Sequence, residues 1–154
     1  MAGTKLKVLL VEDNQDHAEL IRIALSDLVP EDKFYTVTHG EDALNYLYRQ
    51  GVYADKIKSP RPSLILLDIK LPRLDGFDVL RFIKNDEKLK SIPVILLTTS
   101  SDKNEIMRGY QCGANSYVTK PIKFDDFIDC VRNIHYYWSQ TNTPPLLDNN
   151  GYAS

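Results

Sequence analysis

The chain has 154 residues, which is enough for one domain with its own core and too few for two domains of ordinary size. Lysines and arginines number 19 against 21 aspartates and glutamates, a net charge of −2, so no overall field favours nucleic acid or an anionic membrane. The first apolar stretch is short and broken by two acids, unlike a signal peptide or a membrane span. We therefore expect a cytoplasmic protein that binds neither nucleic acid nor membrane.

Five short apolar segments alternate with segments of helical spacing. The expected strands, which lack the polar alternation of half-exposed strands, are Val8 to Val11, Phe34 to Thr38, Leu64 to Leu67, Val94 to Leu97 and Ser116 to Thr119. The apolar positions that predict a helix after each strand are, in order, Ala18, Ile21, Ala24, Leu25 and Leu28; Ala43, Leu44 and Leu47; Val79, Leu80 and Ile83; Ile106 and Tyr110; and Phe124, Phe127, Ile128, Val131, Ile134 and Trp138. This order predicts a doubly wound α/β fold with a parallel sheet and helices on both faces.

Two segments fall outside this alternation. Residues Gly51 to Pro62 are rich in charge and proline, and we expect an exposed loop before the third strand. Residues Thr143 to Ser154 lack periodicity and are expected to form a mobile tail, unless Leu146 and Leu147 dock onto the domain. Cys112 and Cys130 lack metal or CxxC spacing, so we expect two reduced thiols.

Polar residues follow the carboxyl ends of four expected strands, where open parallel sheets bind ligands. They are Glu12 and Asp13, Asp68, Thr98 and Lys120. Singly, each has a simple structural explanation, such as a helix cap, a turn or a solvated charge. Together, three carboxylates would repel one another unless a cation neutralised them, and Mg²⁺ prefers carboxylates, carbonyls, water and phosphate oxygens.

The same residues fit a phosphoryl transfer. A free oxygen of Asp68 could attack phosphorus, while Lys120 and the Thr98 hydroxyl bind the oxygens on which charge accumulates. The edge of the sheet therefore predicts phosphorylation of an aspartate.

Four motifs, VLLVEDNQD, LILLDIKLPRLDG, PVILLTTSS and SYVTKP, resemble the signature blocks of receiver domains of two-component response regulators. The resemblance covers residues 5–141 and leaves 142–154 as a flexible tail. It implies a flavodoxin-like sheet with strand order 2-1-3-4-5. The longer loop before the third strand, the IKNDEKLKSIPVILLTTS segment and a last helix carrying a tryptophan look most like stand-alone cyanobacterial-type regulators paired with phytochrome histidine kinases.

The resemblance also implies roles for the residues at this edge. Asp68 is the phosphoacceptor, Asp13 binds Mg²⁺ directly, Glu12 acts largely through a water ligand, and the Lys70 carbonyl completes the metal shell, in which Mn²⁺ can substitute. The phosphoryl donor is a sensor histidine kinase, expected to be of phytochrome type. In this reading the chain is a signalling protein and catalyses only its own phosphorylation and dephosphorylation.

Thr98 and Lys120 contact the phosphoryl group by the same resemblance. Tyr117 matches the aromatic switch position, although an aromatic residue on an edge strand can simply cover a hydrophobic face. The Lys120–Pro121 peptide bond is expected to be cis. Lys70 is unusual two residues after the acceptor, and its side chain either tunes the lifetime of the phosphorylated state or is merely solvated.

Consecutive aromatic residues in the last helix bear on assembly. Tyr136, Tyr137 and Trp138 cannot all face one core, so at least one is exposed or covered by a partner. We expect a homodimer through the fourth and fifth helices and the strand between them, the alternative being packing under the tail. His17, His39 and His135 lack ligand spacing and are expected to be ordinary surface or half-buried residues.

Two other functions remain open from the sequence. A phosphatase of the haloacid dehalogenase type also uses an aspartate at a strand end, but it generally needs a second aspartate at the position of Lys70. A pseudo-receiver would bind partners without phosphorylation, but such proteins usually lose part of the acidic and lysine set, which this chain keeps. Nucleotide binding is poorly supported, because neither GxxxxGK[ST] nor GxGxxG is present.

Overall fold

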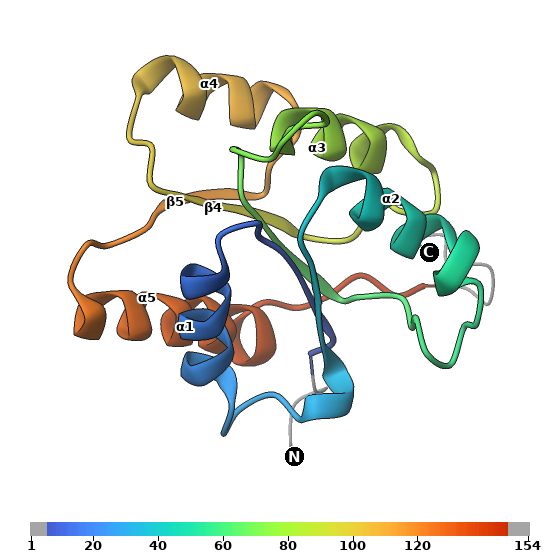
Figure 1. Ribbon diagram of the computed structural model, residues 1–154, viewed down its shortest axis with the longest axis horizontal. Coiled ribbons are helices and arrows are strands. Elements are labelled where there is room, and N and C mark those ends of the chain that lie inside the picture. The colour runs from blue at the N-terminus through green and yellow to red at the C-terminus, as the bar shows by residue number, and fades with distance from the viewer. Residues whose placement is uncertain (1–5, 148–154) are drawn as a thin grey trace.

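A computed structural model describes residues 6–147 and contains one five-stranded sheet with helices on both faces (Figure 1). The strands are β1 (Val8–Val11), β2 (Phe34–Val37), β3 (Leu64–Leu67), β4 (Val94–Thr98) and β5 (Ser116–Thr119). The α-helices are α1 (Gln15–Leu25), α2 (Gly40–Tyr48), α3 (Gly76–Asn85), α4 (Lys103–Gln111) and α5 (Phe124–Tyr136). Short 3₁₀ turns occur at Glu31–Lys33 and Gly51–Tyr53.

All four neighbouring strand pairs are parallel, in the order β2-β1-β3-β4-β5. The chain therefore reverses direction across the sheet after β2, and β1 and β3 lie at its centre. In the register between them, Val11 is opposite Leu67. The residues that follow these two strands consequently emerge side by side, and this is the switch point at which ligands bind in folds of this type.

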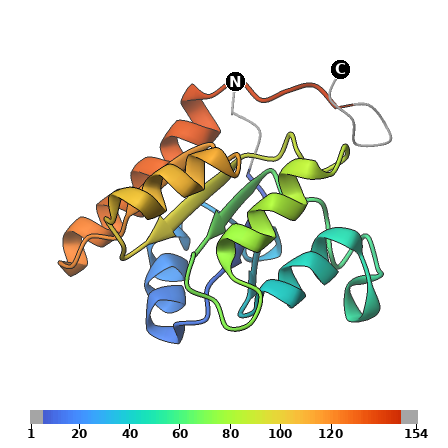
Figure 2. The ribbon, with the colours of Figure 1, turned by 90° about the horizontal axis from the view of Figure 1, so that it is seen from above.

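The sheet separates two hydrophobic cores. Helices α1 and α5 lie side by side on one face, and α2, α3 and α4 cover the other (Figures 1 and 2). Successive residues of the central strands face opposite cores. Leu9 and Val11 pack toward α2 and α3, whereas Val8 and Leu10 pack toward α1 and α5. Burial on both faces explains why these strands are continuous apolar runs without polar alternation.

The expected elements are confirmed, with small differences at their ends. Strand β2 stops at Val37 instead of Thr38, and β4 extends by one residue to Thr98. The loop between residues 51 and 62 is largely exposed as expected, although Ser59 and Pro62 are buried. Within residues 6–147, no helix combines the length and apolar character needed to cross a membrane.

The last helix continues into a π-helical turn at Tyr137–Thr141. Beyond it, residues 143–147 run along the amino-terminal edge of the sheet, where Leu147 and Trp138 line one side of a cavity of ≈ 520 Å³. Leu147 is thus in contact with the domain surface, while Leu146 is 78% exposed. The remaining tail residues, 148–154, lie outside the described part of the chain.

Candidate functional site

Five polar side chains from four strands meet at the carboxyl edge of the sheet. Glu12 and Asp13 follow β1, Asp68 follows β3, Thr98 ends β4 and Lys120 follows β5. One carboxylate oxygen from each of the three acids lies within 4.8 Å of the others. Glu12, Asp68, Thr98 and Lys120 are all buried, whereas Asp13 is exposed and opens the cluster to solvent. The structure therefore brings together the residues expected at this edge from the sequence.

The backbone fixes these positions. The Asp68 amide donates to the Val11 carbonyl at 3.0 Å, and the Lys120 amide donates to the Thr98 carbonyl at 2.6 Å, so the strand pairing continues one residue past each strand end. The start of α3 packs directly against the backbone of Asp68. A Cβ atom on Gly76 would lie 2.2 Å from the Asp68 carbonyl oxygen, which is too close for any side chain. Glycine is therefore required at residue 76.

Charges at the site are only partly balanced. The Lys120 ammonium contacts Glu12 Oε1 and lies 3.3 Å from Asp68 Oδ2. Burial, reinforced by the neighbouring Asp68, raises the pKa of Glu12 to about 7, although Lys120 acts in the opposite direction. One lysine thus faces three carboxylates, and a proton or a further cation is needed to neutralise them.

This donor set fits a hard divalent cation. Glu12, Asp13 and Asp68 offer carboxylate oxygens, the ligands that Mg²⁺ prefers, and exposed Asp13 leaves one side of the cluster open to water. The Lys70 amide donates to Asp68 Oδ1 at 3.3 Å, and the Lys70 side chain is exposed. The site can therefore hold a cation between β1 and β3 while Asp68 Oδ2 remains on the side facing Lys120.

Next to the cluster, Thr98 is fully buried and its hydroxyl oxygen accepts a weak hydrogen bond from the Ser100 amide at 3.4 Å. Tyr117 on β5 is half-buried, and its hydroxyl donates to the Ser100 carbonyl at 2.9 Å. The Tyr117 ring also packs over Gly109 of α4, where a Cβ atom would lie 3.2 Å from a ring carbon. Tyr117 is thus tied to the β4–α4 loop, which begins after Thr98, and its switch role stays a prediction.

One expectation about the site is wrong, and one contact was missed. No cis peptide bond occurs in the described chain, so Lys120–Pro121 is trans, the form of lower energy even before proline, and Lys120 reaches both carboxylates from it. His17 is half-buried as expected, but its Nδ1 lies 2.9 Å from Lys120 Nζ. The sequence carried no signal for this contact, because the two residues are 103 positions apart in the chain, one on α1 and the other just after β5.

At the other end of α5, the consecutive aromatic residues divide as expected. Tyr136 and Tyr137 are 64% and 47% exposed, whereas Trp138 packs against the core beneath α1 and α5. Tyr137 and Trp138 also line a pocket of ≈ 690 Å³ between β5 and α5. Exposed Tyr137 therefore lies beside a hollow in the surface where the dimer interface was expected.

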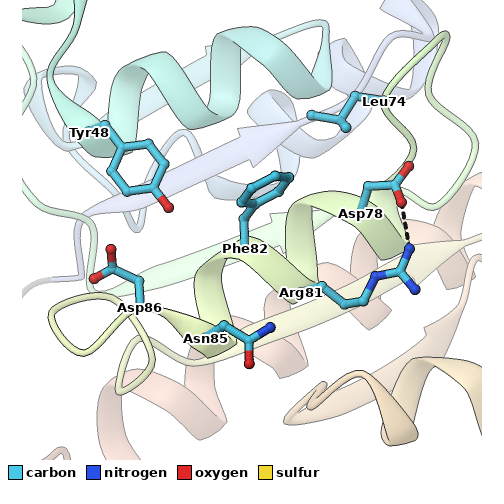
Figure 3. Close-up of a pocket in the computed structure, with 7 residues that line it drawn as sticks. All are labelled: Tyr48, Leu74, Asp78, Arg81, Phe82, Asn85 and Asp86. Carbon is cyan, nitrogen blue, oxygen red and sulfur yellow. Dashed lines mark hydrogen bonds and ion pairs between the residues drawn. The ribbon is translucent and has the colours of Figure 1, made fainter.

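A third hollow lies between α2 and α3. It has a volume of ≈ 500 Å³, and Figure 3 shows Phe82 of α3 lying between Tyr48 of α2 and the Arg81–Asp78 ion pair. No residue of the acidic cluster lines it. Its position separates it from the chemistry at the carboxyl edge.

A parallel sheet of this order, with three acids, a threonine and a lysine at its switch point, defines a doubly wound α/β domain with an acidic binding site at its carboxyl edge. In agreement, residues 8–132 match the family described as "Response regulator receiver domain", and the chain belongs to that family.

Within the family, the similar proteins include a phytochrome response regulator and a probable methanogenesis regulator. The chain is 37% identical to response regulator Rcp1 of Synechocystis sp., over 90% of this chain and 92% of Rcp1. It is 38% identical to a probable methanogenesis regulatory protein, FilR2, of Methanothrix harundinacea, over 90% of this chain and 86% of FilR2. The solved structure of the phosphorylated cyanobacterial phytochrome response regulator RcpA superimposes with a TM-score of 0.86 at 38% identity, covering 93% of this chain and all of RcpA. A Mn²⁺-bound structure of Rcp1 gives a TM-score of 0.78 at 36% identity, covering 90% and 98% of the two chains.

Proposed function

We propose that this chain is a response regulator that accepts a phosphoryl group on Asp68 from a sensor histidine kinase in the cytoplasm, with Mg²⁺ or Mn²⁺ as cofactor. The observation that carries the proposal is the carboxylate triad, with ligand atoms within 4.8 Å, held beside a buried lysine and a buried threonine. The Mn²⁺-bound form of the relative Rcp1 supports the choice of metal.

In this reaction an Asp68 carboxylate oxygen attacks phosphorus, and the bond from phosphorus to the donor's histidine nitrogen breaks. The nitrogen keeps the electron pair and takes up a proton, which leaves an acyl phosphate on Asp68. Lys120 and Thr98 face the equatorial phosphoryl oxygens and stabilise the charge that develops there. When bound, the divalent cation would neutralise the same oxygens and suppress the repulsion between Glu12, Asp13 and Asp68.

Intact-mass measurement tests the reaction. The full chain is incubated with acetyl phosphate and Mg²⁺, and compared with Asp68→Asn and with a sample containing EDTA. We expect a gain of one phosphoryl group in the wild-type protein with Mg²⁺ and none in the other two. The matched variant Asp75→Asn, in the helix cap of α3, should still be phosphorylated. If the wild-type protein with Mg²⁺ also gained no phosphoryl group, the result would favour a pseudo-receiver that is never phosphorylated.

The cognate donor is proposed to be a phytochrome-type histidine kinase, because the titles of three of the similar solved structures describe phytochrome or bacteriophytochrome response regulators. FilR2 is equally similar in sequence, so the assignment needs a direct comparison. We expect phosphate transfer from a phytochrome kinase within seconds to minutes and much slower transfer from a chemotaxis-type kinase. Equal rates with both donors would contradict the pairing.

The output is proposed to involve a homodimer across α4, β5 and α5. Two exposed tyrosines favour this surface, Tyr136 and Tyr137, of which Tyr137 lines the ≈ 690 Å³ pocket, because interfaces are enriched in large aromatic residues. Sedimentation velocity of Tyr136→Ser and Tyr137→Ser should show weaker association than the wild-type protein. Tyr48→Ser, on the opposite side of the sheet, provides the control. Unchanged association in all three would remove the tyrosines from the interface.

A further inference from the structure

The Lys120 ammonium has three partners in this structure, one for each of its N–H donors. It contacts Glu12 Oε1, Asp68 Oδ2 at 3.3 Å and His17 Nδ1 at 2.9 Å. The lysine side chain is almost completely buried, so every donor needs a partner within the protein. No donor is left over for a phosphoryl oxygen.

His17 is the partner that Lys120 can give up most easily. Glu12 and Asp68 attract the ammonium as charged groups as well as acceptors, and a neutral imidazole lacks that attraction. Burial and the nearby lysine charge both lower the pKa of His17, which favours the neutral ring. With Nδ1 accepting from Lys120, the ring proton lies on Nε2.

The imidazole is held in place by two helices. In the first turn of α1, the His17 amide donates to the Asn14 side chain at 3.1 Å. On α5, the ring of buried Phe127 lies 6.0 Å from the His17 ring, centroid to centroid. His17 is therefore an acceptor held in position beside Lys120 by contacts with α1 and α5.

We propose that His17 is a positioning residue, which holds Lys120 Nζ while Asp68 is unphosphorylated and loses this hydrogen bond when a phosphoryl oxygen takes its place. The inference rests on the proposed function and names a regulator of the same site. Because the His17 bond exists only in the unphosphorylated state, it stabilises that state selectively. The strength of the His17–Lys120 hydrogen bond then sets how tightly the site holds a phosphoryl group. The packing between α1 and α5 sets the geometry of this bond.

Binding of beryllium trifluoride, a mimic of the phosphoryl group, tests this role. Its dissociation constant is measured by calorimetry with Mg²⁺ present. His17→Phe keeps an aromatic ring and removes the acceptor. We expect at least about fivefold tighter binding in this variant, because the unphosphorylated protein then contains an unsatisfied buried donor. His17→Asn restores an acceptor at the corresponding distance along the side chain and should return the dissociation constant toward the wild-type value.

His135→Phe is the matched control, a half-buried histidine on α5 outside the site. A purely structural role for His17 would lower the melting temperature of His17→Phe without tightening the binding of beryllium trifluoride. His17→Leu gives a second variant without the acceptor, in case the phenylalanine disturbs folding. Wild-type-like affinity in the Phe and Leu variants, or equal tightening in His17→Asn, would overturn the inference while leaving the proposed function intact. Failure of the wild-type protein to bind the mimic would overturn both.

Discussion

Two lysines at opposite edges of the sheet have very different surroundings. At the amino-terminal edge, Lys84 of α3 donates to the Lys90 carbonyl at 3.0 Å, the Ile92 carbonyl at 2.8 Å and the Asn115 side-chain oxygen at 2.8 Å. At the carboxyl edge, Lys120 binds two carboxylates and an imidazole. Each ammonium uses three donors, but Lys84 binds neutral oxygens whereas Lys120 binds mainly charged side chains.

The difference shows that a buried lysine can either fix the fold through backbone partners or bind side chains that a ligand can displace. Two partners of Lys84 are backbone carbonyls, and Gly113, with a φ of +103°, passes so close that a Cβ atom would lie 2.8 Å from Lys84 Cγ. Lys84 thus fastens the end of α3 to the segments that enter β4 and β5. The partners of Lys120 are side chains, which a cation or a phosphoryl group can draw away. Burial lowers the pKa of Lys84 to about 8, consistent with its three neutral hydrogen-bond acceptors.

Removal of Lys120 should have the largest effect. In Lys120→Met, buried Glu12 and Asp68 lose their counter-ion, and we expect the free energy of unfolding without metal to fall by about 3 kcal/mol. Urea denaturation measures this, and the addition of Mg²⁺ should restore part of the loss. The double variant Glu12→Gln/Lys120→Met should be more stable than Lys120→Met. An unchanged unfolding midpoint in Lys120→Met would show that the ion pairs contribute little.

Removal of Lys84 should cost somewhat less and leave the chemistry unchanged. Lys84→Met strands the Lys90 and Ile92 carbonyls, while the Asn115 oxygen still accepts from the Val94 amide, so we expect a loss of about 2 kcal/mol. Because all its partners are neutral, Mg²⁺ should not restore the loss. Phosphorylation by acetyl phosphate should proceed at the wild-type rate when measured below the unfolding temperature. A slower rate would contradict the separation of the two lysines.

Proton and metal binding should compete at the carboxyl edge only. Since folding raises the pKa of Glu12 from 4.5 to about 7, its stabilising contribution is full below pH 4.5 and is lost as the pH rises through 7. Mg²⁺ needs the ionised carboxylate, so the rise in melting temperature on adding Mg²⁺ should be larger at pH 8 than at pH 6. Glu12→Gln should reduce that difference, and Lys84→Met should retain it. An equal rise at both pH values in the wild-type protein would argue against Glu12 as the titrating group.

The smallest effect is expected for the exposed Lys70. If its side chain approaches a phosphoryl oxygen or obstructs the attacking water, Lys70→Ala should shorten the half-life of phosphorylated Asp68 by about twofold, the scale of an exposed ionic contact. Loss of the phosphoryl mass over time measures the half-life. Lys103→Ala, an exposed lysine in α4, is the control. An unchanged half-life in Lys70→Ala would leave Lys70 as a solvated side chain.

Of the two edges in this comparison, the carboxyl edge with Lys120 could be predicted from the sequence. The apolar runs ending in Glu12, Asp68 and Thr98 predicted both the strands and the edge where the site lies, because parallel strands covered on both faces have a distinctive composition. The ends of the expected strands also identified the acid triad together with Lys120, and the receiver resemblance then added a role for each residue. The chemistry of Lys84 had no such signal, since an isolated lysine in a helical pattern looks like any solvated one.

The amino-acid sequence by itself determined the doubly wound fold, the order of its elements and the clustering of three acids with a threonine and a lysine, because strand composition and motif spacing are local properties. Only the tertiary structure decided that the Lys120 ammonium divides its donors among Glu12, Asp68 and His17, that the Tyr117 hydroxyl binds the Ser100 carbonyl and that Lys84 joins three segments. These contacts link residues far apart in the chain. They depend on how α1 packs against α5 and α3 against the sheet. Local sequence patterns do not predict that packing.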